Sequence, residues 1–483
     1  MQDKVVLYGA PGMGHAISMV ELAKLIFHHH SHQFSITILL ADTDLLYNPS
    51  MDSYLDQISR THPFISFHRF PPISVDTAPT RSPAAMVFES IRLNAPNVLA
   101  SLREMCSSGS NGRVRALVID LFCGSALSIG RDLNIPTYYF FTSGAACLAG
   151  FMYFPRIHEQ YARHESFKYL TDTVLEFPGI PPLKAIHVPE PALDRDDPSY
   201  HDFLFFCSRL PKAEGIIVNT FEGLEPKAVA NLAGGVLSDC NHNTTISIPP
   251  IYCIGPLIAA GEGSDRHDCL SWLDRQPSKG VVFLCFGSRG SFSVKQLREI
   301  ANGLERSGQR FLWVVKKPPS KVKSKQTQYV SDFDLESILP GGFLERVKDR
   351  AMVVKSWVPQ VTVLRHGSVG GFVTHCGWNS VLEAVVAGVP MVAWPLHAEQ
   401  HMNRNVLVEE MKMAIAVEQK DEEDGFVSGA ELEARVNALM DSDQGKKLRE
   451  TGLLMRQKAL AALSGNGSSI RSLNQLIEEW KRD

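Results

Sequence analysis

Short apolar runs alternate with longer amphipathic runs along almost the whole chain. KVVLYG, SITILLA, RALVIDLF and GIIVNT are rich in β-branched and aromatic residues, and each lies next to a helix-length segment such as AISMVELAKLIF or GSALSIGRDLN. This alternation predicts βαβ units, and therefore a parallel sheet with helices on both of its faces.

The same pattern restarts after a stretch rich in Pro, Gly and Asp at residues 249–268. GVVFLCFGS, RFLWVV, MVVKSWVP, GGFVTH and PMVAWP follow, again with helix-length segments between them. We therefore predict two α/β halves joined by a linker near residues 250–265. The closing segment SSIRSLNQLIEEWKRD predicts an amphipathic helix with Ile470, Leu473, Leu476 and Ile477 on one face.

Length and composition agree with a multidomain globular protein. A chain of 483 residues exceeds one ordinary domain, and its net charge of −4 gives no electrostatic reason to expect nucleic acid or an anionic membrane as a partner. No apolar run approaches the ~20 residues of a membrane span, and MQDKVVLYGAPGMGH does not have the form of a signal peptide. The nine cysteines are scattered without a CxxC pair, which favours reduced thiols and a cytoplasmic location.

The stretch FVTHCGWNSVLEAVVAGVP, residues 372–390, is the first with a chemical signal. An apolar strand ends at His375, and a helix is expected to begin near Trp378. A helix N-terminus offers unpaired backbone N–H groups to an anion, Asn379 and Ser380 add donors in the first turn, and Gly377 allows close approach. The joint predicts a phosphate site; the alternative is an ordinary capped helix in a parallel sheet.

One carboxylate lies on the same helix. Glu383 follows Asn379 by four residues, so both side chains project from one face. A carboxylate there suits a diol such as that of a ribose, although it could also be a plain surface charge. The helix is expected to stop at Gly388, before Pro390.

The first glycine turn, YGAPGMGH, carries a second signal. Gly9, Gly12 and Gly14 form GxxGxG rather than the GxGxxG of dinucleotide binders, which argues against a nicotinamide-dependent reductase. His15 stands at the start of the following helix, where a neutral imidazole can accept a proton. Asp120, at the end of the strand RALVID, is its natural carboxylate partner. The alternatives are a helix-cap histidine and a strand-end aspartate.

From Trp357 to Gln400 the chain resembles, at full length, the signature box of the plant family 1 UDP-glycosyltransferases. WVPQVTVL opens the block, the joint at 372–390 occupies its middle, and PMVAWPLHAEQHMN closes it. The resemblance implies a GT-B-type α/β fold, in which two Rossmann-like doubly wound domains face each other across a cleft. Residues 1–250 would bind the acceptor, residues 251–464 would bind the UDP-sugar, and the helix at 465–483 would pack back on the first domain.

The resemblance also implies roles for single residues. The donor site would comprise Trp357 on uracil, Gln360 between base and ribose, Glu383 on the ribose hydroxyls, His375, Asn379, Ser380 and Ser288 on the pyrophosphate, Glu399 and Gln400 on the sugar, and Thr142 on sugar or phosphate. Trp378 also belongs to the expected donor site. It stands where glucuronosyl-transferring relatives tend to carry arginine, and Gln400 stands where galactose users tend to carry histidine, so UDP-glucose is the expected donor. Glu399 stands where many relatives have aspartate, which could relax the choice of sugar.

His15 and Asp120 match the catalytic dyad of the family. The implied reaction is an inverting, metal-independent transfer that needs no cofactor besides the donor and gives a β-O-glucoside. The alternatives are C-glucosylation of the same acceptors, glucosylation of simple phenols or terpenoids, and an inactive sugar-nucleotide-binding protein. We expect a monomer whose partners are the UDP-sugar and a small phenolic acceptor.

The acceptor is the weakest part of the prediction. Apolar and aromatic walls suit a flat polyphenol, and the candidates are Phe88, Phe122, Phe141 and a loop at residues 180–205. GHAISMVELAK departs from the commoner GHxxPM form and resembles a subgroup that often glucosylates flavonoids, isoflavonoids and chalcones. Arg289, directly after Ser288, is a candidate for contact with the acceptor or for a solvent-exposed charge.

Overall fold

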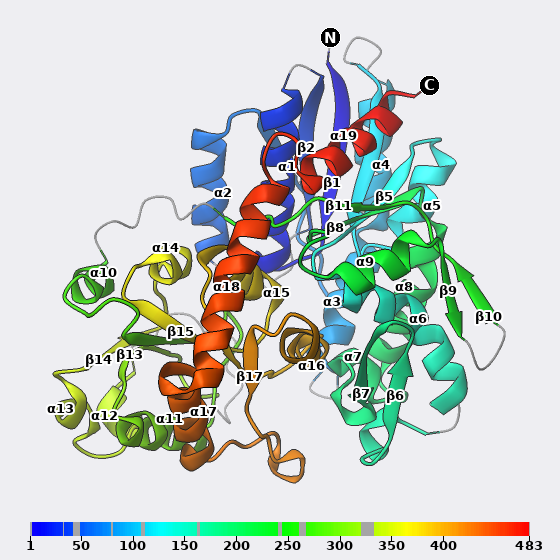
Figure 1. The fold of residues 1–483 in the computed structure, drawn as a ribbon. Coiled ribbons are helices and arrows are strands. Elements are labelled where there is room, and N and C mark those ends of the chain that lie inside the picture. Colours follow the sequence, from blue (N-terminus) through cyan, green and yellow to red (C-terminus); the bar gives the residue numbers. More distant parts are fainter. Residues whose placement is uncertain are drawn as a thin grey trace. The chain divides into compact units, whose positions relative to one another are not determined.

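Two compact units make up the chain. The computed structural model describes residues 2–31, 33–41, 49–78, 81–107, 112–161, 165–239, 244–259, 267–319 and 333–482. Unit 1 comprises residues 1–259 and 461–483, and unit 2 comprises residues 260–460 (Figure 1). Part of the expected linker, residues 260–265, lies outside the described residues.

Seven parallel strands form the main sheet of unit 1. Their order is β11-β8-β5-β4-β1-β2-β3. The strands are β1 (Asp3–Gly9), β2 (Phe34–Leu40), β3 (Ile65–Arg69), β4 (Val114–Asp120), β5 (Thr137–Phe141), β8 (Gly215–Val218) and β11 (Ile251–Cys253). Most of these strands read as continuous apolar runs because helices cover both faces of the sheet. The strand order reverses between β1 and β4, and ligands of doubly wound sheets bind at such a point, beyond the carboxyl ends of the strands.

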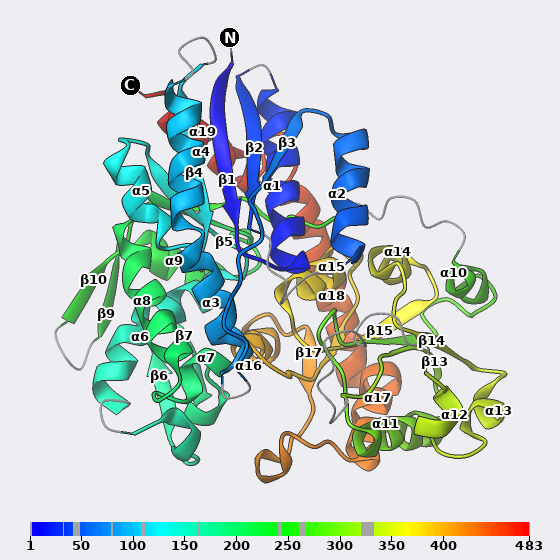
Figure 2. The same ribbon diagram turned by 180° about the vertical axis from the view of Figure 1, so that it is seen from behind.

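Helices pack on both faces of this sheet (Figure 2). The helices of unit 1 are α1 (Met13–His30), α2 (Pro49–Thr61), α3 (Pro83–Leu93), α4 (Ala95–Ser107), α5 (Ala126–Asp132), α6 (Ala145–Tyr161), α7 (Glu190–Leu193), α8 (Pro198–Arg209), α9 (Pro226–Ala233) and α19 (Ser468–Lys481). Leu22 of α1 and Leu473 of α19 belong to one core with Val5 and Val118. The amphipathic pattern of the closing segment therefore directs its apolar face onto the sheet of unit 1.

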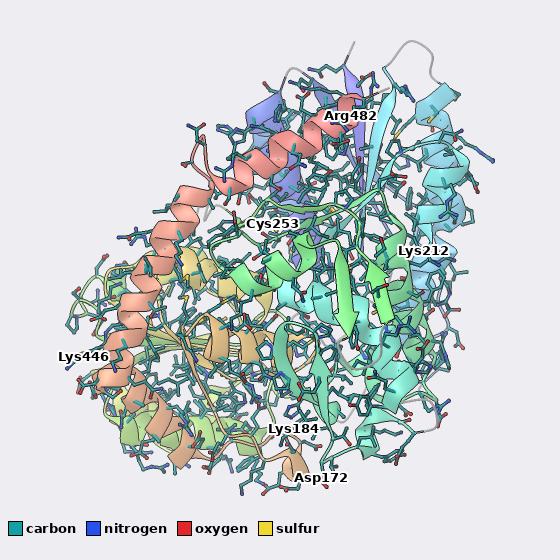
Figure 3. The ribbon with its side chains drawn as sticks, turned by 45° about the vertical axis from the view of Figure 1, so that its right-hand side comes forward. Asp172, Lys184, Lys212, Cys253, Lys446 and Arg482 are labelled. Atoms are coloured by element: carbon teal, nitrogen blue, oxygen red, sulfur yellow. The ribbon has the colours of Figure 1, made fainter. Side chains whose placement is uncertain are left out.

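The boundary between the units lies later than the sequence indicated. β11 pairs with β8 and so extends the sheet of unit 1, which moves the boundary from residue 250 to residue 259. α19 packs beside β11 and β4, and Figure 3 labels Cys253 at the end of β11 and Arg482 just after α19. The run Ile251–Cys253 is short and lies next to a segment rich in proline and glycine, so its sequence resembles a linker. Only the pairing with β8 makes it a strand.

The segment at residues 180–205 is not a loop. It contains β7 (Ile180–Lys184), which forms an antiparallel hairpin with β6 (Val174–Phe177), followed by α7 and the first two thirds of α8. Leu183, Ala192 and Phe203 are buried there. A second antiparallel hairpin pairs β9 (Val236–Asp239) with β10 (Thr244–Ser247). Prolines at 181, 182, 189 and 191 hid the elements between residues 180 and 205 from the pattern of the sequence.

Unit 2 has a six-stranded parallel sheet in the order β14-β13-β12-β15-β16-β17. Its strands are β12 (Val281–Cys285), β13 (Arg310–Val315), β14 (Ala351–Lys355), β15 (Val369–Thr374), β16 (Met391–Ala393) and β17 (Ala414–Ala416). Its helices are α10 (Asp268–Leu273), α11 (Val294–Ser307), α12 (Leu335–Ile338), α13 (Phe343–Val347), α14 (Gln360–Arg365), α15 (Trp378–Ala387), α16 (Gln400–Asn405), α17 (Gly429–Asp441) and most of α18 (Asp443–Ala462). This order reverses between β12 and β15, as in unit 1.

One core lies between the sheet and the helices α11 and α17. Leu297 of α11 and Leu432 of α17 share it with Val282, Trp313 and Val373 of the strands. α14 and α15 both contact β15. The packing fixes the carboxyl ends of β12, β13, β14 and β15, and the expected donor residues follow these ends in sequence.

Candidate active site

The switch point of the unit 1 sheet brings His15 and Asp120 together. β1 ends at Gly9, and the glycine turn leads into α1, whose first turn contains His15. Gly12, the residue before the helix, has a φ of 122°, which L side chains rarely adopt, so the turn depends on glycine there. Asp120 is the last residue of the neighbouring strand β4. Two positions 105 residues apart thus meet at one edge of the sheet.

The two side chains are joined by a short hydrogen bond. Nδ1 of His15 donates to Oδ2 of Asp120 at 2.7 Å, and the other oxygen, Oδ1, accepts the backbone N–H of Phe122 at 3.1 Å. Asp120 is fully buried, whereas the His15 side chain is 28% exposed. The carboxylate therefore fixes the Nδ1–H tautomer, which makes Nε2 the nitrogen that can accept a proton.

An aromatic cluster lies beside this pair. The Phe122 ring is 5.7 Å from the imidazole of His15, and it contacts both Phe88 at 5.2 Å and Phe206 at 5.9 Å between centroids. Phe88 and Phe206 are buried, while Phe122 is half-buried. Among these rings, Phe122 presents the most surface to an acceptor. Phe206 was missed by the sequence, because it lies on α8, one residue beyond the segment 180–205 that reads as a loop.

Two other unit 1 candidates lie one strand away. Phe141 ends β5 and is fully buried, with its ring against Phe151 at 5.6 Å, so it offers no surface to a ligand. The expectation that Phe141 forms a wall of the acceptor site therefore does not fit the structure. Thr142 follows it at the carboxyl end of the strand and is half-buried.

In unit 2 the expected donor residues gather at the carboxyl edge of the sheet. Ser288 follows β12, Trp357 follows β14, His375 follows β15, and Glu399 follows β16. Because all these strands are parallel, their carboxyl ends meet at one edge. Residues of the signature block that are far apart in the sequence thus lie at the same edge of the sheet.

His375 is enclosed by glycines. A Cβ added at Gly287 or at Gly377 would lie 2.4 Å from its Nε2, so neither position tolerates a side chain with the imidazole in place. Burial, with the nearby basic groups His397 and Lys316, lowers the pKa of His375 to about 3. The imidazole is therefore neutral at physiological pH. Its Nδ1 is buried and has no hydrogen-bond partner in the described part of the chain.

The helix α15 begins next to this histidine. Cys376 has a φ of 63°, which turns the chain sharply, and Gly377 is the N-cap. The first turn contains no acidic residue, so its backbone N–H groups and positive dipole end suit an anion. The helix ends at Gly388 with a φ of 71°, as the sequence predicts. Trp378 is buried at the first position, which makes it part of the packing of the joint.

Gln360 connects the neighbouring polar side chains. Its Nε2 donates to Ser380 Oγ at 2.8 Å and to Glu383 Oε2 at 2.7 Å. Burial raises the pKa of Glu383 to about 7, although the hydrogen bond from Gln360 and the charge of Arg365 lower it. This carboxyl group therefore exchanges a proton near neutral pH.

Trp357 is the exposed aromatic side chain at this edge. It is 62% exposed, which is unusual for tryptophan, and its ring is 6.1 Å from that of His267. Exposed aromatic faces are suited to stack on a base. Asn379, by contrast, is half-buried in the first turn of α15.

The loop after β16 orients two further polar side chains. Oε1 of Gln400 accepts the backbone N–H groups of Leu396 at 2.9 Å and His397 at 3.0 Å. This fixes the amide orientation, so that only the NH₂ of Gln400 can serve a ligand. Asn403 Nδ2 donates to the Cys376 carbonyl at 3.0 Å and to Glu399 Oε1 at 3.3 Å. Asn403 was missed, although its spacing of four residues from Glu399 on one helix face is a visible signal.

Arg289 is exposed directly after Ser288. Burial lowers the pKa of His397 to about 4, and the positive charge of Arg289 lowers it further. The guanidinium therefore lies near the loop that carries Glu399 and Gln400, the two residues expected to contact the sugar.

The described ranges contain neither a metal site nor a membrane span. No group of three or more His, Cys, Asp or Glu side chains there could hold a metal ion. No helix of the described chain is long and apolar enough to cross a membrane.

Comparison with known proteins gives consistent matches. Residues 247–447 match the family model of UDP-glucoronosyl and UDP-glucosyl transferase. The chain is 59% identical to UDP-glycosyltransferase 88F3 of Pyrus communis and 58% identical to a phloretin 2'-O-glucosyltransferase of Malus domestica, with 99% of both chains covered in each case. A solved structure, Phytolacca americana UGT2 complexed with UDP-2fluoro-glucose and pterostilbene, is 37% identical and has a TM-score of 0.85, with 99% of this chain and 100% of that chain covered. The predicted fold class, two Rossmann-like α/β domains of the GT-B type, is confirmed.

Proposed function

Since this chain belongs to the UDP-glucoronosyl and UDP-glucosyl transferase family and is a glycosyltransferase, we propose that it transfers glucose from UDP-glucose to a phenolic hydroxyl of a chalcone or flavonoid. The observation that carries the proposal is the pair His15 and Asp120 at the switch point of unit 1. The expected donor residues of unit 2, where Gln360 donates a hydrogen bond to Glu383, support it. Phloretin is the first acceptor to test, because a relative with 58% identity is named for it.

The chemistry follows from His15. Its Nε2 takes the proton of the acceptor hydroxyl while the oxygen attacks the anomeric carbon, and the bond from that carbon to the diphosphate oxygen breaks. Asp120 stabilises the imidazolium that forms. Phenols suit this base because their pKa of ~10 is far below that of an aliphatic alcohol. Attack opposite the leaving group converts an α-linked donor into a β-glucoside.

The donor set provides the remaining contacts. Trp357 stacks on uracil, Gln360 and Glu383 contact the ribose, and the N-terminus of α15 with His375 receives the diphosphate. This electrostatic stabilisation of the leaving group makes metal independence our expectation. The set is completed by Ser288, Asn379 and Ser380 on the diphosphate, and by Thr142, Glu399 and Gln400 on the sugar side.

We also retain the expectations of a cytoplasmic monomer that needs no cofactor besides its donor. Scattered cysteines support the location. The alternatives of C-glucosylation, of other acceptor classes and of an inactive sugar-nucleotide-binding protein are less favoured, because related chains are named as O-glucosyltransferases of polyphenols.

A mass-resolved assay tests the proposal. Purified protein, UDP-glucose and EDTA are incubated with phloretin, flavones, isoflavones, simple phenols and terpenoid alcohols, and each product is then treated with acid. We expect phloretin or a flavonoid to gain one hexosyl residue that acid removes, and UDP-glucose to exceed UDP-galactose and UDP-glucuronate as donor. An acid-stable product would establish C-linkage, and UDP binding without turnover of any acceptor would contradict the proposed activity.

A further inference from the structure

A lysine outside the expected donor set lies at the same edge of unit 2. Lys316 directly follows β13, the strand between β14 and β12. Its Nζ donates to the backbone carbonyls of Gly287 and of Ser288, the latter at 2.6 Å. Both carbonyls belong to the loop after β12, and Gly287 turns there with a φ of 71°. The ammonium group therefore fixes the shape of the loop that lies over His375.

Among the described residues, no carboxylate pairs with the charge of Lys316. In the described ranges its ammonium forms no ion pair with a carboxylate, and the carbonyls use two of its three donors. Burial lowers its pKa, as expected for a cation that has lost water without gaining an anion. The charge of Lys316 acts on the nearby side chains of Cys285 and His375, and it lowers the pKa of His375.

His375 cannot supply this positive charge itself. With a pKa of about 3 it is neutral, so it offers the diphosphate a hydrogen bond but no net charge. A half-buried cation behind the histidine, without a carboxylate, suits an anion that arrives from outside. The diphosphate of the donor is such an anion.

We propose that Lys316 is a positioning residue for the diphosphate: it holds the loop at Gly287 and Ser288 in its binding shape and provides the positive charge that balances the phosphates. This inference rests on the proposed UDP-sugar function. It predicts a loss of affinity that depends on the phosphates of the ligand and not on its nucleoside.

The test compares two ligands by titration calorimetry with the full-length protein. UDP carries the diphosphate, and uridine has the same base and ribose without it. Lys316→Met should weaken UDP binding by about tenfold to a hundredfold, the range for a hydrogen bond to a charged group, and leave uridine binding unchanged. Lys316→Arg should restore much of the UDP affinity. Lys317→Met, at the exposed neighbouring position, is the matched control and should bind both ligands like the wild type.

A further variant separates charge from structure. Lys316→Gln removes the charge and keeps N–H donors for the two carbonyls, on a side chain one atom shorter, so it should fold even where Lys316→Met does not. It should also lose UDP affinity while keeping uridine affinity. Equal losses of affinity for UDP and for uridine would show that Lys316 has only a structural role. Unchanged UDP affinity would show that Lys316 does not act on the diphosphate. Either result overturns the inference. If the wild type binds neither ligand, the proposed function fails as well.

Discussion

At the scale of the residue, the proton position on His15 depends on Asp120. The 2.7 Å bond holds the imidazole in one tautomer, and the buried carboxylate stabilises the charge that develops during transfer. Asp120→Asn should therefore lower kcat by about a hundredfold to ten-thousandfold, and His15→Ala by a similar factor. Steady-state assays of the single and double variants check this, together with UDP titration as a control for the donor site. A double variant much slower than either single variant would contradict action as one unit.

A second residue-scale effect concerns Glu383. Its pKa is raised from 4.5 to about 7 in the folded state, so the folded protein binds more protons than the unfolded chain between those values. Stability linked to this group is therefore present below pH ~4.5 and lost as pH rises through ~7. Glutamine is a neutral isostere and does not titrate, so Glu383→Gln avoids that loss. As pH rises from 5 to 8, the free energy of unfolding of Glu383→Gln should increase relative to that of the wild type. The increase should be on the order of 1 kcal/mol after allowance for solvent screening.

Thermal melts of the two proteins across this pH range measure the effect. Other titrating groups are common to both proteins, so their contributions cancel in the difference. A difference in Tm that stays constant with pH would show that the Glu383 carboxyl titrates at its ordinary value.

At the scale of the element, the joint between β15 and α15 depends on the absence of side chains. Gly377→Ala places a Cβ where the His375 imidazole stands, although the φ of −63° at this position suits alanine. We expect α15 to form, stability to change little, and UDP affinity to fall by about tenfold because the imidazole is displaced. Calorimetry with UDP measures the loss. Gly367→Ala, where a Cβ meets no atom within 4 Å, is the control and should bind UDP normally.

At the scale of the whole molecule, the sequence predicted the strands and site residues whose placement depends on the local pattern of apolar and polar residues. The strands β1, β4, β12 and β15 are buried apolar runs, and His15, Asp120 and His375 follow strands or open helices, so their placement could be predicted. β11 could not be predicted, because three residues become a strand only by pairing with β8. Phe206 and Lys316 were missed because their contacts join segments that are far apart in the chain. The amide orientation of Gln400 depends on two backbone N–H groups that no pattern reveals.

The separate cores of the two units lead to a prediction about unfolding. Trp480 belongs to the last helix, yet its ring packs against Phe34 and Tyr138 of unit 1, with centroids 6.0 and 5.9 Å away. Trp480→Ala should cost about 3–5 kcal/mol and act on unit 1, although residues 260–460 lie between the two parts of that unit. Hydrogen exchange should show lost protection in β1, β2, β4 and β5, with β12, β13 and β15 still protected.

The matched variant is Trp313→Ala, which removes a fully buried ring from the core of unit 2. It should produce the reverse pattern, with protection lost in β12, β13 and β15 and retained in unit 1. UDP binding should follow the same division, because the expected nucleotide contacts lie in unit 2: it should survive Trp480→Ala and fail with Trp313→Ala. Equal loss of protection in both units from either variant would mean that the two cores unfold as one cooperative body.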